Sequence, residues 1–347
     1  MSAPEAGPEC VVGLDIGGTK LAAGVVGRDG AVLSFSSRPT PARRAPLLAD
    51  LLAVIDVAVA DARGRHPGLR VVGAGVGCGG PLDRARGTVT PVNMPALVDE
   101  PVVEQVAAHL GVPTALENDA TAAALGEQRH GAGRGAHDLV YLTVSTGIGG
   151  GVVADGRPLR GATGNAAELG HVVVQTDGRA CVCGQSGCLE AYASGRSIAA
   201  RAVEAMAAPG AAASVLSSST TVTSADVAAA ARAGDPVATS VWAQTAEMLG
   251  RGLALAVQVF DPEVVVLGGG VMQVGEQLLG PARLAAGTAA ARCLFVLARL
   301  GPHVGVVGAG VVALDHLQAL AADPAPGLPL PGSRSDPHPH TVPRSRP

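Results

Sequence analysis

The chain has 347 residues, which suggests about two domains with ample room for a buried core. Its formal net charge of −4 argues against a general nucleic-acid or membrane-surface role, and 2% aromatic residues leave almost no platforms for stacking bases. The N-terminus has no signal-peptide pattern and no apolar run long enough to span a membrane appears. The reduced cytoplasm is therefore the expected compartment.

The first third of the chain is expected to alternate strands and helices after a disordered tail over residues 1–9. Apolar segments on both sides of a Gly-Gly turn predict a strand, a turn and a second strand over Cys10–Val26. Helical spacing of apolar residues predicts a helix over Pro46–Arg63. A buried strand in Leu69–Asp83 then enters a second glycine turn, and Glu100–Leu110 is a short helix.

The middle of the chain continues the alternation. A strand ends at Glu117-Asn118-Asp119 and an alanine-rich helix follows, ended by Gly131. Leu139–Gly156 repeats the opening pattern of strand, glycine turn and strand. Two helices are then predicted on either side of a Ser/Thr loop over residues 214–224, at Tyr192–Ala213 and Ala225–Gly234.

The last third contains a long helix over Asp235–Val259 and a buried strand that ends in a third glycine turn, residues 268–270. The apolar run over residues 303–310 predicts a further strand, followed by a helix over Val311–Ala322. Residues 323–347 hold eight prolines with Ser and Arg and are expected to be a disordered tail. The whole pattern predicts an α/β protein with two sheets.

Two of the glycine turns are candidate phosphate sites, because bare backbone amides can approach an anion closely. Hydroxyls of Thr19 and Thr146 add donors, Asp15 could hold Mg²⁺ through water, and Lys20 is the only lysine among 25 basic residues. Ordinary hairpins remain the alternative for any single turn. The residues in question are Asp15, Gly17, Gly18, Thr19, Lys20, Thr146 and Gly147.

Asn118 and Asp119 lie where a strand stops and a helix starts. Both residue types commonly serve as helix N-caps. Asp119 also suits a general base that takes a proton from a hydroxyl as it attacks phosphorus. The spacing alone leaves the two interpretations open.

Three of the six cysteines, Cys181, Cys183 and Cys188, fall within eight residues, and His171 lies ten positions upstream. This set predicts a closed, tetrahedral zinc site that braces the fold; a redox-active or disulfide-bonded loop is the alternative. Glu168 and Glu190 flank the cluster. A braced wall carrying two carboxylates and an imidazole suits recognition of a polyol.

Five segments in this order and spacing resemble the ROK family (repressors, open reading frames and sugar kinases) of the actin-like ATPase superfamily. They are LDIGGTK, LENDATAAALGE, LTVSTGIGGG, GNAAELGH and CVCGQSGCLE. The resemblance covers about Val11 to Leu320 and is strongest to the bacterial ATP-dependent glucokinases. It implies a two-domain ribonuclease-H-like fold: residues 10–119 with a C-terminal helix over about 303–322, and residues 120–302 with the zinc motif.

The resemblance also implies roles for individual residues. Asp119 would be the catalytic base on the sugar 6-hydroxyl, and the chain would assemble as a dimer or tetramer. The phosphates of ATP would be faced by Gly17, Gly18, Thr19, Lys20, Thr146 and Gly147. Sugar hydroxyls would be bound by Asn93, Asn118, Glu168, His171 and Glu190. The adenosine side would be formed by Gly268, Gly269 and Gly270, and the structural zinc would be held by His171, Cys181, Cys183 and Cys188.

Alternatives remain for the substrate and the class of protein. The sugar site of an N-acetylmannosamine kinase resembles this one, and two loops depart from the related kinases at Gly79-Gly80-Pro81 and at Asn93-Met94-Pro95. A non-catalytic sugar sensor is the alternative of another class. Specific DNA binding is not expected, because only nine residues precede the first strand.

Overall fold

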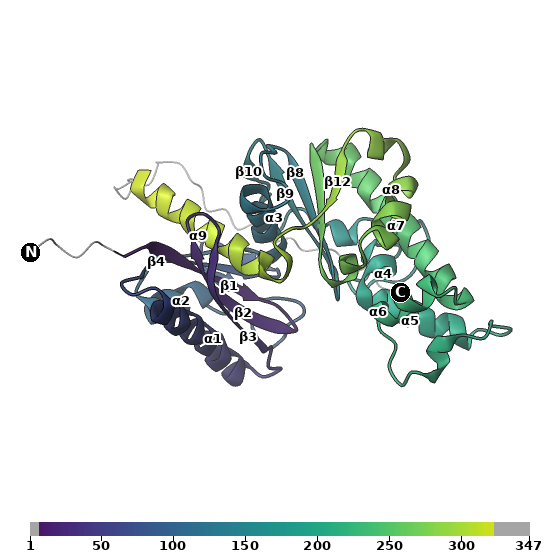
Figure 1. Ribbon diagram of the computed structural model, residues 1–347, viewed down its shortest axis with the longest axis horizontal. Coiled ribbons are helices and arrows are strands. Elements are labelled where there is room, and N and C mark those ends of the chain that lie inside the picture. The colour runs from purple at the N-terminus through teal and green to yellow at the C-terminus, as the bar shows by residue number, and fades with distance from the viewer. Residues whose placement is uncertain (1–6, 323–347) are drawn as a thin grey trace, which may run out of the picture.

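The computed structural model describes residues 7–322, so the expected tail over 323–347 and most of that over 1–9 lie outside the described residues. The first strand already begins at Glu9. Two five-stranded sheets form the frame, as predicted, and each is completed by helices (Figure 1).

The first sheet has the strand order β3-β2-β1-β4-β7. β1, β2 and β3 are antiparallel neighbours, whereas β1, β4 and β7 run parallel, so the last three strands end at the same edge. The strands are β1 (Glu9–Ile16), β2 (Lys20–Gly27), β3 (Val32–Pro39), β4 (Arg70–Cys78) and β7 (Thr114–Asn118). Helices α1 (Arg44–Arg65) and α2 (Val102–Leu110) cover one face, and α9 (Val304–Ala322) covers the other (Figure 1).

The second sheet has the order β10-β9-β8-β11-β12. Its strands are β8 (Leu139–Val144), β9 (Ile148–Ala154), β10 (Arg157–Pro158), β11 (Val264–Gly268) and β12 (Leu294–Leu297). Helix α3 (Asp119–His130) packs on β8 and β9, and the large core beside the sheet is filled from the later helices. These are α4 (Glu190–Ala193), α5 (Gly195–Ala207), α6 (Ser224–Arg232), α7 (Pro236–Phe260) and α8 (Glu276–Ala285). A short hairpin, β5 (Leu82–Asp83) and β6 (Thr88–Val89), follows the second glycine turn.

Helix α9 corrects one prediction: residues 303–310 do not form a strand, because the helix already begins at Val304. The backbone of α9 packs closely against the backbones of β1 and α3. A Cβ on Gly13 would fall 1.9 Å from the carbonyl oxygen of Val306, and one on Gly308 would fall 2.1 Å from that of Ala122 in α3. The missing side chain of Gly13 thus allows α9 to pack closely on β1, and that of Gly308 allows α9 to pack closely on α3.

Helix α9 also has the length and apolar character of a membrane span. The segment Gly301–Ala322 has a mean hydropathy of 1.6 over its most apolar window, of which half is buried. It packs on β1 and β4 and crosses α3, so its apolar surface has protein neighbours. The composition of α9 is accounted for by these contacts.

The remaining differences concern the second half. The helix predicted over Tyr192–Ala213 is two helices, α4 and α5, and ends at Ala207 ahead of Pro209, which disfavours helical geometry in its predecessor. The predicted Ser/Thr loop holds a 3₁₀ helix over Val215–Ser218, and Ser224 already belongs to α6. The pattern did not reveal α8 or β12.

Candidate active site

Asp15 and Asp119 lie close enough to interact electrostatically at the edge where β1, β4 and β7 end. Asp15 in β1 and Glu117 in β7 both pair with Gly77 of the intervening strand, and Asp119 opens α3 two residues later. Burial raises the pKa of Asp15 to about 7, the charge of Asp119 adds to the rise, and Lys20 opposes it. Burial also raises the pKa of Asp119, against the hydrogen bond that its Oδ1 accepts from the Ala120 amide at 2.7 Å. The edge therefore holds two buried carboxyl groups whose pKa values are both raised.

The hydrogen bonds assign the helix cap to one residue of the Asn-Asp pair. Asn118 is the N-cap of α3, since its Oδ1 accepts hydrogen bonds from the amides of Ala120 and Thr121 at 3.0 and 3.1 Å. Asp119 follows as the first helical residue. Its Oδ2 lies 3.8 Å from the position that a Cβ on Gly79 would occupy, and the Oδ1 of Asn93 lies 3.9 Å from the same position. The second glycine turn thus brings Asn93 and Asp119 together.

The first glycine turn is short and held by backbone. The Gly17 amide donates to the carbonyl of Lys20 at 3.0 Å, and the Thr40 hydroxyl donates to the Gly17 carbonyl at 2.6 Å. Thr19 is exposed at its tip. The Lys20 ammonium lies 5.7 Å from the centroid of the Phe35 ring, a cation–π distance.

The turn between β8 and β9 is anchored by Glu190. The Oε2 of Glu190 accepts a hydrogen bond from the Ile148 amide at 2.8 Å, and a Cβ on Gly147 would lie 2.7 Å from the same oxygen. Glycine is therefore required at position 147 for the carboxylate to reach the turn. Glu190, predicted as a sugar ligand, is also a structural support of the predicted phosphate turn.

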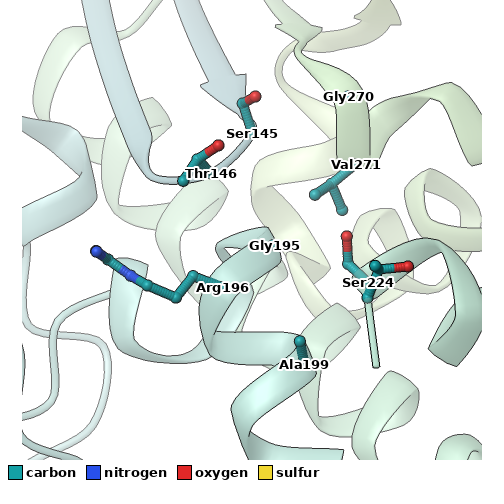
Figure 2. Close-up of a pocket in the computed structure, with 9 residues that line it drawn as sticks. Ser145, Thr146, Gly195, Arg196, Ala199, Ser224, Gly270 and Val271 are labelled. Carbon is teal, nitrogen blue, oxygen red and sulfur yellow. The ribbon is translucent and has the colours of Figure 1, made fainter. Parts of the chain in front are cut away.

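A cavity of about 360 Å³ opens beside this turn (Figure 2). It joins the turn after β8, the turn after β11 and the starts of α5 and α6. Its lining comprises Ser145, Thr146, Gly195, Arg196, Ala199, Thr223, Ser224, Gly270 and Val271.

Of the residues predicted for ATP, Thr146 and Gly270 line this cavity. Gly268 and Gly269 lie behind its wall: a Cβ on Gly268 would be 2.4 Å from the Tyr141 hydroxyl oxygen, and Gly269 has a φ of 92°. The sequence prediction did not include Arg196, Thr223 or Ser224. The end of the Ser/Thr run, which was assigned to a loop without a role, was the available signal for two of them.

The four predicted zinc ligands converge. One donor atom from each of His171, Cys181, Cys183 and Cys188 lies within 4.8 Å of all the others. The Cys181 Sγ and His171 Nδ1 are 3.7 Å apart, as are the sulfurs of Cys183 and Cys188. Tetrahedral zinc with bonds of about 2.3 Å separates two sulfurs by roughly 3.8 Å. The donor set fits zinc, and the cysteines are free thiols, which disfavours the disulfide alternative.

Glu168 stands between the metal cluster and the acidic edge. Desolvation raises the pKa of Glu168, His171 lowers it, and the charges of Asp119 and Glu190 raise it further. The residue before it, Ala167, has a φ of 66°, whereas the four other non-glycine residues with positive φ in residues 7–322 are all aspartates. Ala167 therefore holds backbone strain directly beside a predicted sugar ligand.

Comparisons with known proteins identify the family of this chain. The sequence model of the ROK family matches residues 11–316. A glucokinase of Streptomyces coelicolor is 36% identical over 315 residues, which cover 88% of this chain and 97% of that protein.

Two further relatives bear on the ligands. The crystal structure of a ROK family glucokinase from Streptomyces griseus in complex with glucose and AMPPNP has a TM-score of 0.74 and 38% identity, covering 88% of this chain and 99% of that one. An N-acetylmannosamine kinase of Shigella boydii is 40% identical over 190 residues, 54% of this chain and 62% of that protein.

Proposed function

Because this chain belongs to the ROK family, as its five motifs predicted, we propose that it is an ATP-dependent hexose kinase that converts ATP and glucose to ADP and glucose 6-phosphate. The observation that carries the proposal is the position of Asp119. Its carboxylate faces the second glycine turn with a raised pKa, beside Asp15 and within reach of the same turn as Asn93. The S. griseus glucokinase complex with glucose and AMPPNP supports both substrates.

In the proposed mechanism, Asp119 accepts the proton of the sugar 6-hydroxyl while that oxygen attacks the terminal phosphorus of ATP in line. Its raised pKa makes it a better proton acceptor than an exposed aspartate. Sugar hydroxyls are held by Asn93, Asn118, Glu168, His171 and Glu190. The Asn118 side chain has its oxygen committed to α3, so its NH₂ group is the part that would donate to a hydroxyl.

The phosphate chain would lie between the first glycine turn, residues 17–20, and the turn at Thr146 and Gly147, with the adenosine toward Gly270 and the neighbouring Gly268 and Gly269. Asp15 would hold Mg²⁺ through water, and the ion would neutralise charge on the phosphate oxygens. A cation next to Asp15 would stabilise the ionised carboxylate and so offset the desolvation and the repulsion from Asp119 that raise its pKa.

We assign a structural role to the zinc that would bind His171, Cys181, Cys183 and Cys188. With zinc on Nδ1, which is turned toward the sulfur cluster, the Nε2 of His171 would carry the proton and would donate to a sugar hydroxyl. The metal would thereby fix the tautomer and the direction of one sugar-binding side chain. Gly184 and Gly187, with φ of 91° and 82°, allow the chain to turn around the metal.

The test is a coupled ADP-release assay with MgATP against glucose, mannose, N-acetylmannosamine, N-acetylglucosamine, fructose and allose. Turnover on glucose supports the proposal, and Asp119→Asn should abolish most of it while glucose binding is kept. Turnover on N-acetylmannosamine alone would favour the second candidate, which the S. boydii relative supports. Sugar binding without turnover on any of the six would favour a sensor.

The organisation of the molecule follows the same proposal. We infer one domain from residues 10–119 with the helix over about 303–322, and a second from residues 120–302. We also infer a cytoplasmic homo-oligomer, a dimer or tetramer, with no nucleic-acid or membrane partner. Size-exclusion chromatography with light scattering would measure the assembly.

A further inference from the structure

Arg196 lies on the wall of the cavity and carries a positive charge. It lies outside the five segments that resemble the ROK family. It is the second residue of α5, and its side chain is 55% exposed. Figure 2 shows it extending from the start of the helix on the side of Thr146, away from Ser224. The residue therefore stands beside the turn after β8.

The guanidinium of Arg196 is poorly satisfied by protein. Its Nη2 lies 3.3 Å from the Oε1 of Glu190, a long contact, and the other oxygen of Glu190 is held by the Ile148 amide at 2.8 Å. A guanidinium carries five N–H donors. Arg201, one turn and a half later on the same helix, is buried and donates to Tyr192, Val241, Gln244 and Thr245. Arg201 is built into the core, whereas Arg196 keeps most of its donors for another acceptor.

Lys20, the cation next to the first glycine turn, has a partner of its own. The Lys20 ammonium lies over the Phe35 ring. A triphosphate chain with its negative charges needs cations and donors in addition to backbone amides, and a planar guanidinium matches phosphate oxygens in pairs. Arg196 supplies such a group directly beside Thr146.

We propose that Arg196 binds the phosphate chain of the nucleotide and stabilises the charge of the transferred group. In the absence of nucleotide the guanidinium rests on Glu190, and with nucleotide it turns to the phosphate oxygens. The role in transfer rests on the kinase function proposed above; the role in nucleotide binding does not. The proposal adds one catalytic residue to the site.

The test compares Arg196→Met with Arg283→Met in the full-length protein. Arg283 makes an ion pair of the same length, 3.3 Å, with Glu276 and lies outside the cavity. Binding of AMP, ADP and AMPPNP, each with Mg²⁺, is measured by titration calorimetry. One charge-assisted hydrogen bond corresponds to roughly tenfold to hundredfold in affinity. Arg196→Met should lose this factor for AMPPNP and ADP and little for AMP, and Arg283→Met should bind all three as the parent does.

Turnover provides the second measurement. Arg196→Met should lower kcat/KM for ATP with the Kd for glucose unchanged, and Arg196→Lys should recover part of the loss. Equal AMPPNP affinity in Arg196→Met and the parent would overturn the inference while leaving the kinase proposal intact. Weaker glucose binding alone would also overturn it, because Arg196 would then act through Glu190. A parent protein that binds AMPPNP in this pattern but phosphorylates no sugar would refute the kinase function and support the binding role.

Discussion

The raised pKa of Asp15 predicts that Asp15→Asn stabilises the protein at neutral and alkaline pH. An ordinary aspartate has a pKa of 3.8, and burial raises that of Asp15 to about 7. Since the folded state binds this proton more tightly than the unfolded chain, stability is highest below pH 3.8 and falls as the pH rises toward 7. A shift of about three units corresponds to about 4 kcal/mol once the group is ionised.

The free-energy cost of ionising buried Asp15 can be separated from other effects of the substitution by its pH dependence. It amounts to about 2 kcal/mol at pH 5 and about 4 kcal/mol at pH 8. The advantage of Asp15→Asn over the parent should therefore grow by about 2–3 kcal/mol between these pH values. Urea unfolding at both pH values measures it, and the exposed Glu104→Gln in α2 serves as a control without this pH dependence. An equal difference at pH 5 and pH 8 would show that the carboxyl group has no raised pKa.

Three other substitutions test parts of the structure. Gly308→Ala should cost about 3 kcal/mol or more in urea unfolding, because the methyl group would meet the Ala122 backbone at 2.1 Å; Gly64→Ala, with no atom within 4 Å, should be neutral or slightly stabilising. Ala167→Gly should raise the free energy of unfolding by about 0.5–1 kcal/mol, since relief of the strain at φ 66° exceeds the entropic cost of glycine, and a loss of stability would contradict this. Cys183→Ser should reduce zinc content, measured by mass spectrometry of metals, from about one ion per chain to a small fraction and lower the Tm, and an unchanged metal content would remove the Cys183 assignment.

The sequence predicted the frame of this fold well where strands and turns alternate. β1, β2, β8 and β9 are short, nearly continuous apolar runs around Gly-rich turns, and α1 and α7 carry clear helical patterns, so local rules are sufficient there. The start of α9 was predicted wrongly because its valines and glycines favour a strand in isolation. Its helical form is imposed by tertiary contact with Gly13 and Gly75, whose absent side chains make room for the helix.

The candidate site shows the same division. The metal ligands could be read from sequence because they are close along the chain and chemically distinctive. Arg196 could not, because no local pattern encodes the placement of α5 beside the turn after β8. The Asn118–Asp119 question needed coordinates as well: a cap and a base are both compatible with the sequence, and the hydrogen bonds assign the cap to Asn118, while the base role of Asp119 stays a proposal.

The composition of the first glycine turn has a practical consequence for labelling. Lys20 is the only lysine, so an amine-reactive reagent has one ε-amine to modify in the whole chain besides the terminal amino group. That amine stands at the start of β2, next to the turn that we expect to meet the phosphates. A single fluorophore could thus be attached there without mutagenesis, and intact-mass spectrometry would count it. The sequence therefore offers one defined ε-amine for site-specific conjugation.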